Sequence, residues 1–338
     1  MEIGLFSFGD VIPHPVTGQR VSHAERVRQL VRLGALAEEV GLDVFALGEH
    51  HRLDMVVSSP AVILSAVAAR TERIRLSSAT TLLNTLDPVR VYEDFATLDL
   101  VSGGRAEILA GRGSFTESWD LFGYDIRQYD ALFAEKLDLF LKINANERVT
   151  WSGRFRPALE DAEVSPRAER PLPLWIGVGG TPQSAARAGA LGLPMNIAIL
   201  GGPERFPPFA AIHREAAAKA GKPRPKLALS THGLLADDAA TARDAFADAW
   251  GGLMRNGLRN RFPPREVPRE YLDHEMGPKG AFLAGNAEDA IEKLRFYHRL
   301  FANDRFLVQF DWAGEPWEKV KRAVEILGTE VAPAVRSL

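Results

Sequence analysis

Short apolar segments alternate with longer amphipathic segments along almost the whole chain. The apolar segments are nearly continuous runs, a pattern typical of parallel strands that are buried on both faces. In the longer segments apolar residues recur at helical spacing, and a capping box at Ser22 and Glu25 begins the first helix, which Gly41 ends. The predicted strands are residues 2–8, 42–47, 74–80, 105–110, 174–178, 194–199, 226–235 and 305–310. The predicted helices are residues 22–40, 61–70, 88–100, 131–143, 182–191, 206–220, 239–254, 287–301 and 316–328.

Eight predicted strands, each followed by a helix, fit a parallel sheet that closes into a (β/α)8 TIM barrel. A doubly wound open sheet is the competing α/β architecture. Insertions are expected after strands 4 and 7: an irregular stretch over 111–130, a polar hairpin over 147–171 and a Pro- and Arg-rich segment over 257–280. No linker or composition shift divides the chain, so residues 1–338 are expected to form one domain. In a barrel the functional site lies where strands end and helices begin.

Composition and charge exclude several function classes. The 338 residues carry a net charge of -3, which offers no strong positive field for nucleic acid or anionic lipid. With no cysteine, the chain forms no disulfide, thiolate metal site or iron–sulfur cluster. No apolar stretch approaches the roughly 20 residues that span a bilayer, and MEIGLFSFGD lacks the features of a secretion signal. We therefore expect a cytoplasmic protein that contacts neither nucleic acid nor membrane.

Polar residues follow the second predicted strand directly, in the run Gly48-Glu49-His50-His51. A histidine at this end of a barrel can exchange protons near neutral pH. Because consecutive strand residues point to opposite sides, only one of His50 and His51 is expected to face the pocket. A structural histidine is the alternative. No metal site is predicted, because adjacent residues seldom converge on one ion and no HExxH helix is present.

Small residues lie at the ends of three neighbouring strands, and two of these ends contain glycines. Arg112, between Gly111 and Gly113, suits a grip on phosphate or carboxylate, although a surface arginine in a flexible loop is the alternative. The run from Gly177 to Ser184 is a glycine turn into a helix N-terminus, which can bind an anion or be an ordinary turn capped by Thr181. Both segments could reach one phosphate. Small residues over 77–81 leave room for a flat ligand, or simply fit a tapering barrel.

An ordered set of motifs over essentially the whole chain resembles the bacterial luciferase-like flavin-dependent monooxygenase family. The set comprises Gly48-Glu49-His50-His51, Asp87-Pro88-Val89-Arg90, Ser102-Gly103-Gly104-Arg105, Gly111-Arg112-Gly113 and Leu121-Phe122-Gly123. The resemblance implies a barrel that binds FMN at the carboxyl ends of its strands. It also implies that reduced FMN, as co-substrate, reacts with dioxygen to oxidise a small organic substrate. A separate flavin reductase and a homodimer are further expectations.

The resemblance assigns roles to individual residues. His50 matches the active-site acid/base beside the flavin ring, and Ala79-Thr80 matches a non-prolyl cis peptide that supports the ring. Arg112 matches the arginine that holds the phosphate. The remaining cofactor positions are Gly111, Gly113, Gly179, Gly180 and Gln183, with Ser114 or Thr116 as substitute phosphate donors.

The chain also departs from the family pattern. An acidic residue, Asp130, stands near the place of a second phosphate-binding arginine, and Gly180 and Gln183 replace hydroxyl-bearing residues. Both changes weaken the expected side-chain grip on phosphate. Two alternatives therefore stay open: a deazaflavin-dependent hydride-transfer oxidoreductase, and a flavin-binding protein without catalysis. The expected substrate-side residues are Phe6, Phe8, Phe115, Trp119 and Trp312, and the 257–280 insertion is expected either to cover the site or to be a solvated loop.

Overall fold

The computed structural model describes residues 1–113, 115–256 and 263–338. Eight parallel strands pair side to side, and the pairing of the seventh with both the sixth and the eighth closes them into a barrel. The last strand pairs with the first, with Glu2 opposite Arg305 and Leu5 opposite Val308. The barrel strands are β1 (Glu2–Ser7), β2 (Val44–Leu47), β3 (Arg75–Ser78), β5 (Ala106–Gly111), β8 (Leu174–Val178), β9 (Met195–Ala198), β10 (Leu227–Leu235) and β12 (Arg305–Gln309). The predicted (β/α)8 TIM barrel is confirmed.

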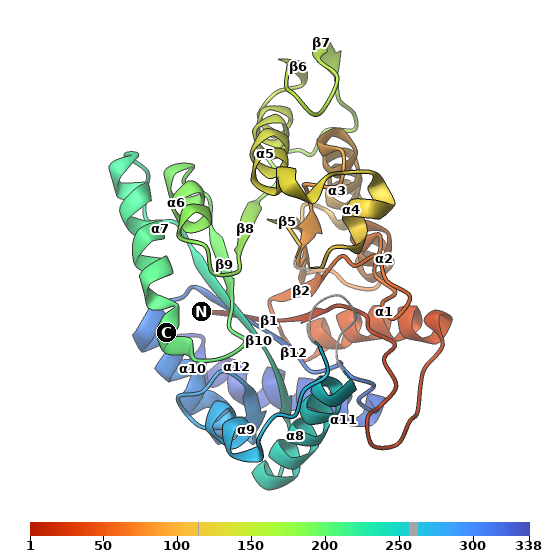
Figure 1. Cartoon of the computed structure of the whole chain (residues 1–338), viewed down its shortest axis with the longest axis vertical. Helices are drawn as coiled ribbons and strands as arrows, with labels where there is room; N and C mark the ends of the chain where they lie inside the picture. Colours follow the sequence, from red (N-terminus) through yellow and green to blue (C-terminus); the bar gives the residue numbers. More distant parts are fainter. Residues whose placement is uncertain (114, 257–262) are drawn as a thin grey trace.

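Helices surround the barrel and cover the outer face of its strands (Figure 1). Ser22 caps the first helix by accepting a hydrogen bond from the Glu25 backbone N–H, as its sequence position predicts. The main helices are α1 (His23–Glu39), α2 (Pro60–Ala68), α3 (Pro88–Ser102), α5 (Tyr129–Ala145), α6 (Pro182–Ala190), α7 (Pro207–Lys219), α8 (Ala239–Asn256), α10 (Ala287–Phe301), α11 (Trp317–Ile326) and α12 (Ala332–Val335).

Shorter elements lie between these units. Figure 1 shows the antiparallel hairpin of β6 and β7 projecting beyond α5, which agrees with the hairpin expected within 147–171. The expectation of low regularity for 257–280 is wrong in part, because α9 forms there and buries Leu272 and Met276; residues 257–262 lie outside the described residues. The additional elements are β4 (Thr81–Leu82), α4 (Glu117–Phe122), η1 (Ile126–Gln128), β6 (Arg148–Trp151), β7 (Leu159–Glu163), η2 (Pro203–Arg205), α9 (Arg269–Met276), β11 (Leu283–Gly285) and η3 (Leu327–Val331).

Side chains fill the barrel interior in layers. At the amino end, Arg305 donates to Glu107 at 3.1 Å and to Glu2 at 2.7 Å, and its guanidinium lies over the Trp175 ring. Phe6 and Leu307 belong to the next, apolar layer. The interior is therefore a packed core, and in barrels of this type the functional site lies at the carboxyl end of the strands.

Candidate functional site

The His50 imidazole lies at the carboxyl end of the barrel between two aromatic rings. Its ring centroid is 4.9 Å from that of Phe8 and 5.0 Å from that of Phe115, both in edge-on contact. The backbone N–H of His50 donates to the Val57 carbonyl at 2.8 Å, which fixes the segment after β2. The side chain is half-buried, so the imidazole is held between the two rings and still reaches the barrel mouth.

The neighbouring His51 has a different environment. Its Nε2 lies 2.8 Å from a carboxylate oxygen of Glu49, and its ring packs edge-on against Phe122 of α4. The other oxygen of the buried Glu49 carboxylate accepts a hydrogen bond from the Leu82 backbone N–H at 3.0 Å. The two imidazoles therefore point into separate surroundings, and the Glu49–His51 pair fastens β4 to the end of β2.

The segment after β3 lies against two glycines. The Ala79–Thr80 peptide bond is cis, as the family resemblance implied. The Thr80 carbonyl accepts a hydrogen bond from the Glu49 N–H at 2.9 Å. A Cβ atom on Gly111 would lie 2.7 Å from Thr80 Oγ1, and one on Gly177 would lie 3.1 Å from Thr80 Cγ2. Only glycine leaves room for Thr80 at Gly111, and the three strand ends together form a shelf with short side chains.

Arg112 and the turn before α6 meet, as their positions on neighbouring strands predicted. One guanidinium nitrogen of Arg112 donates to Thr181 Oγ1 at 3.0 Å and to Ser184 Oγ at 2.7 Å. The guanidinium carbon lies 4.7 Å from the centre of the Tyr129 ring, whose hydroxyl donates to the Gly113 carbonyl at 2.9 Å. The Arg112 side chain is only 13% exposed, so these contacts hold it in one orientation.

The hydroxyls that reach Arg112 are not at the positions that the family pattern indicated. Gly180, with φ +124°, and Gly179 have open space where a Cβ would stand, and Gln183 is exposed. Thr181 occupies the N-cap position of α6 without capping it; its hydroxyl is 2.7 Å from that of Ser184. Ser184 and Tyr129 were not expected at this site, and Thr181 was expected only as a helix cap. The sequence feature that could have indicated these contacts is the pair of hydroxyl residues Thr181 and Ser184, three positions apart at the start of a helix.

Asp130 adds a negative charge to this cluster. Its carboxylate forms an ion pair with the second terminal nitrogen of Arg112. The Asp130 side chain is 75% exposed, so it covers the arginine from the solvent side. Ser114, expected as a substitute phosphate donor, lies outside the described residues.

The opposite wall of the mouth is aromatic and contains a second histidine. His232, on β10, has its ring 5.8 Å from Phe6, 5.7 Å from Trp250 and 5.5 Å from Trp312. Burial lowers its pKa to about 4, so the ring is neutral at pH 7. Among the expected substrate-side residues, Phe6, Phe8, Phe115 and Trp312 contact the two histidines in this way. Trp119 instead stacks on Tyr129, beside Arg112.

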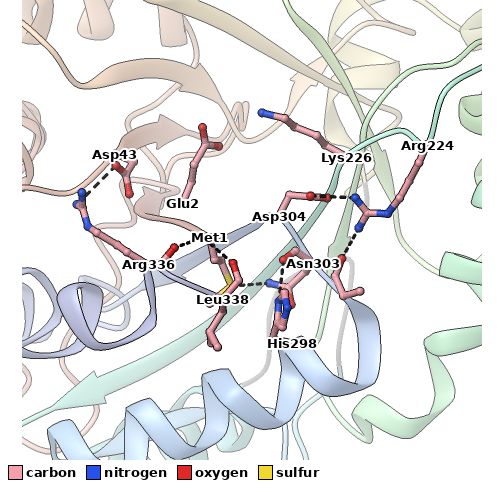
Figure 2. Close-up of a pocket in the computed structure, with 11 residues that line it drawn as sticks. Met1, Glu2, Asp43, Arg224, Lys226, His298, Asn303, Asp304, Arg336 and Leu338 are labelled. Atoms are coloured by element: carbon pink, nitrogen blue, oxygen red, sulfur yellow. Dashed lines mark hydrogen bonds and ion pairs between the residues drawn. The ribbon is translucent and has the colours of Figure 1, made fainter.

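The amino end of the barrel has a groove of its own, of about 540 Å³, at the two ends of the chain (Figure 2). Arg224 pairs with Asp304 at 3.0 Å and Arg336 with Asp43 at 3.5 Å, while the Met1 amine donates to the Arg336 carbonyl at 2.7 Å. These contacts join the two ends of the chain to the amino end of the barrel. In the described residues no group of three His, Asp or Glu side chains could hold a metal ion, and no helix is long and apolar enough to cross a membrane.

Comparison with known proteins adds a family and a fold. Residues 1–304 match the family model described as luciferase-like monooxygenase. The chain is 25% identical over 299 residues to the N-acetyl-S-alkylcysteine monooxygenase of Bacillus subtilis, which covers 84% of this chain and 86% of the relative.

Two solved structures have the same fold over almost their full lengths. One is the oxygenating constituent of 3,6-diketocamphane monooxygenase from Pseudomonas putida, in complex with FMN; it has a TM-score of 0.79 and 19% identity, and the match covers 99% of this chain and 98% of that one. The other is an F420-dependent secondary alcohol dehydrogenase, with a TM-score of 0.76, 18% identity and coverage of 99% of both chains. The barrel thus resembles proteins with either of two flavin-type cofactors.

Proposed function

Because the chain belongs to the family of luciferase-like monooxygenases, we propose that it is an FMN-dependent monooxygenase that uses reduced flavin and dioxygen to oxidise a small organic substrate. The observation that carries the proposal is the donor cluster in which the Arg112 guanidinium meets the hydroxyls of Thr181 and Ser184. Reduced FMN, when bound, supplies the electrons for dioxygen activation, which no side chain of this protein can supply.

The donor cluster suits the phosphate of FMN. A guanidinium and two hydroxyls offer charge-assisted and neutral hydrogen bonds, and the first turn of α6 adds backbone N–H groups with a favourable helix dipole. Gly179 and Gly180 leave the approach to that turn open, because no side chain stands there. We assign Arg112, Thr181, Ser184, Gly179 and Gly180 to the phosphate.

The shelf around Thr80 suits a flat ring. Gly111 and Gly177 bring the ends of β5 and β8 close to Thr80 without side chains above them. A planar ligand can therefore lie against Ala79, Thr80 and Gly111. Gly111, at the shelf, and Arg112, in the donor cluster, are consecutive residues. The shelf and the cluster are therefore neighbours, and one ligand can contact both.

His50 is the proposed acid/base group. Its imidazole is held by Phe8 and Phe115 at the mouth of the barrel, where one ring nitrogen can hold or release a proton beside the bound ring. The same two aromatic rings, with Trp312 opposite, reduce the access of water to the site. Exclusion of water shields reactive intermediates from side reactions.

The proposed activity needs partners. We propose that a separate flavin reductase supplies free reduced FMN, as the family resemblance implies; the sequence contains no GxGxxG dinucleotide fingerprint. We also propose a homodimer through α2 and α3, on which Val62 is 70% exposed and Val101 56% exposed. Sedimentation of the wild type and of Val62→Asp tests the dimer: the substitution is expected to yield monomers.

A deazaflavin-dependent hydride-transfer oxidoreductase is the second candidate, and Asp130 is the observation that favours it. The carboxylate that pairs with Arg112 lowers the net positive charge of the site. This disfavours the doubly charged phosphate of FMN more than a singly charged phosphodiester. A flavin-binding protein without catalysis is the third candidate.

Titration of the purified protein with oxidised FMN, reduced FMN and deazaflavin separates the candidates, with Arg112→Ala as the matched variant. Tighter binding of reduced FMN, weakened by about tenfold or more in Arg112→Ala, supports the monooxygenase. Selective binding of deazaflavin supports hydride transfer instead. Binding of reduced FMN that dioxygen then oxidises no differently from free reduced FMN indicates the non-catalytic alternative, and binding of none contradicts all three.

A further inference from the structure

Two polar side chains near the barrel mouth contain buried atoms that have no hydrogen-bond partner among the described residues. Both amide atoms of Gln309 are buried and unpaired, and the residue is fully buried. Nδ1 of His232 is likewise buried and unpaired. Such groups are rare in folded proteins, because a buried amide or imidazole without a partner costs about 1–3 kcal/mol. A missing partner, either water or a ligand, is the usual explanation.

Strand register directs both side chains into the barrel. Gln309 and His232 lie opposite each other in the pairing of β12 with β10. Alternate residues on β12 point inward: Arg305 bonds to Glu107 in the interior, and Leu307 packs against Phe6. On β10, Ser230 accepts a hydrogen bond from Asn196 of β9 on the same inner face. Gln309 and His232 therefore continue the two inner rows upward to the mouth.

Aromatic rings surround this polar pair. The His232 ring lies 6.2 Å from Phe8 and also contacts Phe6, Trp250 and Trp312. Phe8 in turn is in edge contact with His50, so the pair lies one ring away from the proposed acid/base group. Aromatic faces favour a flat, apolar partner.

The charge of the pair restricts the partner further. Gln309 is uncharged, and burial lowers the pKa of His232 far below 7, so neither residue can neutralise an ionic ligand at pH 7. A carboxylate or ammonium placed here would lose its hydration without gaining a counter-ion. A neutral oxygen atom, in contrast, can accept a hydrogen bond from the Gln309 amide or from an imidazole N–H, and a hydroxyl can donate to either residue.

We propose that Gln309 and His232 form a substrate-recognition site for a neutral aromatic compound that carries a hydroxyl or carbonyl oxygen. The assignment rests on the proposed monooxygenase function, of which this compound would be the substrate. The aromatic rings hold the body of the compound, and the two polar groups fix its oxygen within the barrel mouth near His50.

Calorimetric titration of the flavin-free protein with three ring compounds of matched shape tests this site. The probes are 4-methylphenol, 1,4-dimethylbenzene, which lacks the oxygen, and 4-methylbenzoate, which is charged. We expect 4-methylphenol to bind at least about tenfold more tightly than 1,4-dimethylbenzene, and 4-methylbenzoate to bind most weakly. Equal binding of the phenol and the hydrocarbon, or binding of none of the three, overturns the assignment.

Substitutions separate recognition from packing. Gln309→Leu and His232→Phe are each expected to weaken 4-methylphenol at least about fivefold and to leave 1,4-dimethylbenzene unchanged or tighter. The melting temperature of Gln309→Leu should equal or exceed that of the wild type, because the substitution removes a buried unpaired amide. Gln19→Leu, at an exposed glutamine, is the control for both measurements. A stable Gln309→Leu variant that binds the phenol as the wild type does contradicts the proposal.

The same proteins, titrated separately with reduced FMN, keep the two proposals apart. Phenol binding that depends on Gln309 in a protein that binds no flavin supports the recognition site and contradicts the monooxygenase. Flavin binding with no preference among the ring compounds supports the flavoprotein and overturns the recognition site.

Discussion

The Asp130 carboxylate is paired with the Arg112 guanidinium, which also donates to Thr181 and Ser184. The arginine is thus held between two neutral hydroxyls on one side and one negative charge on the other. Since Arg112 is largely buried and Asp130 largely exposed, the carboxylate is the partner that can turn away when an anion binds. This arrangement makes Asp130 a competitor of any phosphate at the site.

Asp130→Asn is therefore expected to tighten FMN binding. The substitution removes a negative charge beside the phosphate position and should lower the Kd by about 3- to 10-fold at low salt, with a smaller gain at high salt. Riboflavin, which lacks the phosphate, should bind equally to both proteins. Fluorescence titration of both ligands measures the change. Asp161→Asn is the control, because Asp161 also pairs with an arginine but on the exposed β6–β7 hairpin. Unchanged or weaker FMN binding in Asp130→Asn would show that the carboxylate orients Arg112 instead.

Gly111→Ala is expected to destabilise the protein and to disturb the shelf under Thr80. The new Cβ would lie 2.7 Å from both Thr80 Oγ1 and Thr80 Cγ2, so one of the two segments has to move. Crowding of this kind typically costs about 1–3 kcal/mol. Urea unfolding measures the loss, with Gly179→Ala as control, since nothing lies within 4 Å of a Cβ at that position. Equal stability of the two variants would contradict the tight contact.

The fold could be predicted from the sequence because burial leaves a strong pattern. Strands covered on both faces are nearly continuous apolar runs, and each is followed by a segment of helical period, which predicts an α/β fold; the eight strand–helix units favour a closed barrel over an open sheet. The helix α9 was missed because its segment, REYLDHEM, is mostly charged and follows several prolines. Its buried residues, Leu272, Glu275 and Met276, become apparent only when the neighbouring elements are in place.

The candidate site was predictable where adjacent strand ends converge and not where contacts depend on side-chain direction. Arg112 and the turn before α6 come from neighbouring strands, so their meeting follows from topology. The pairing of Arg112 with Asp130 depends on the path of the chain through α4 and η1, which no periodicity encodes. Gln309 and His232 were overlooked because their segments were recognised by their apolar residues, and the inward direction of the polar ones becomes clear only from the pairing of β10 with β12.

Glu49→Ala is expected to loosen the attachment of β4 to the end of β2. The buried carboxylate bonds to His51 at 2.8 Å and accepts from the Leu82 N–H at 3.0 Å, so its removal leaves two buried partners unsatisfied. A loss of about 2–4 kcal/mol in the free energy of unfolding follows from the cost of such groups. Chemical denaturation of Glu49→Ala beside Glu39→Ala, at an exposed position of α1, measures it. If both variants unfold alike, the Glu49 contacts are not important for stability.

Asp10 is expected to make the stability of the protein depend on pH between about 4 and 7. Burial raises the pKa of this carboxyl to about 7, and the nearby charge of Asp311 acts in the same direction, although Arg26 partly opposes both. Its Oδ2 accepts a hydrogen bond from the Ala313 N–H at 2.8 Å, and Arg26 comes no closer than 4.0 Å to its other oxygen. The folded protein therefore retains a proton in a pH range where the unfolded chain, with an ordinary pKa near 3.8, has lost it.

The direction of the effect follows from this difference in bound protons. As pH rises from about 4 to 7, the contribution of Asp10 to the free energy of unfolding falls by up to about 1.4 kcal/mol per pH unit. Asp10→Asn carries no titrating group at this position, so its stability relative to the wild type should increase steadily across the same range and level off above pH 7. Urea unfolding at pH 5, 6, 7 and 8 gives the difference at each pH, which cancels the other titrating groups. Asp248→Asn, at an exposed position of α8, should differ from the wild type by a nearly constant amount. A constant difference for Asp10→Asn as well would mean that Asp10 is ionised in the folded protein throughout, and that Arg26 stabilises it more than burial opposes it.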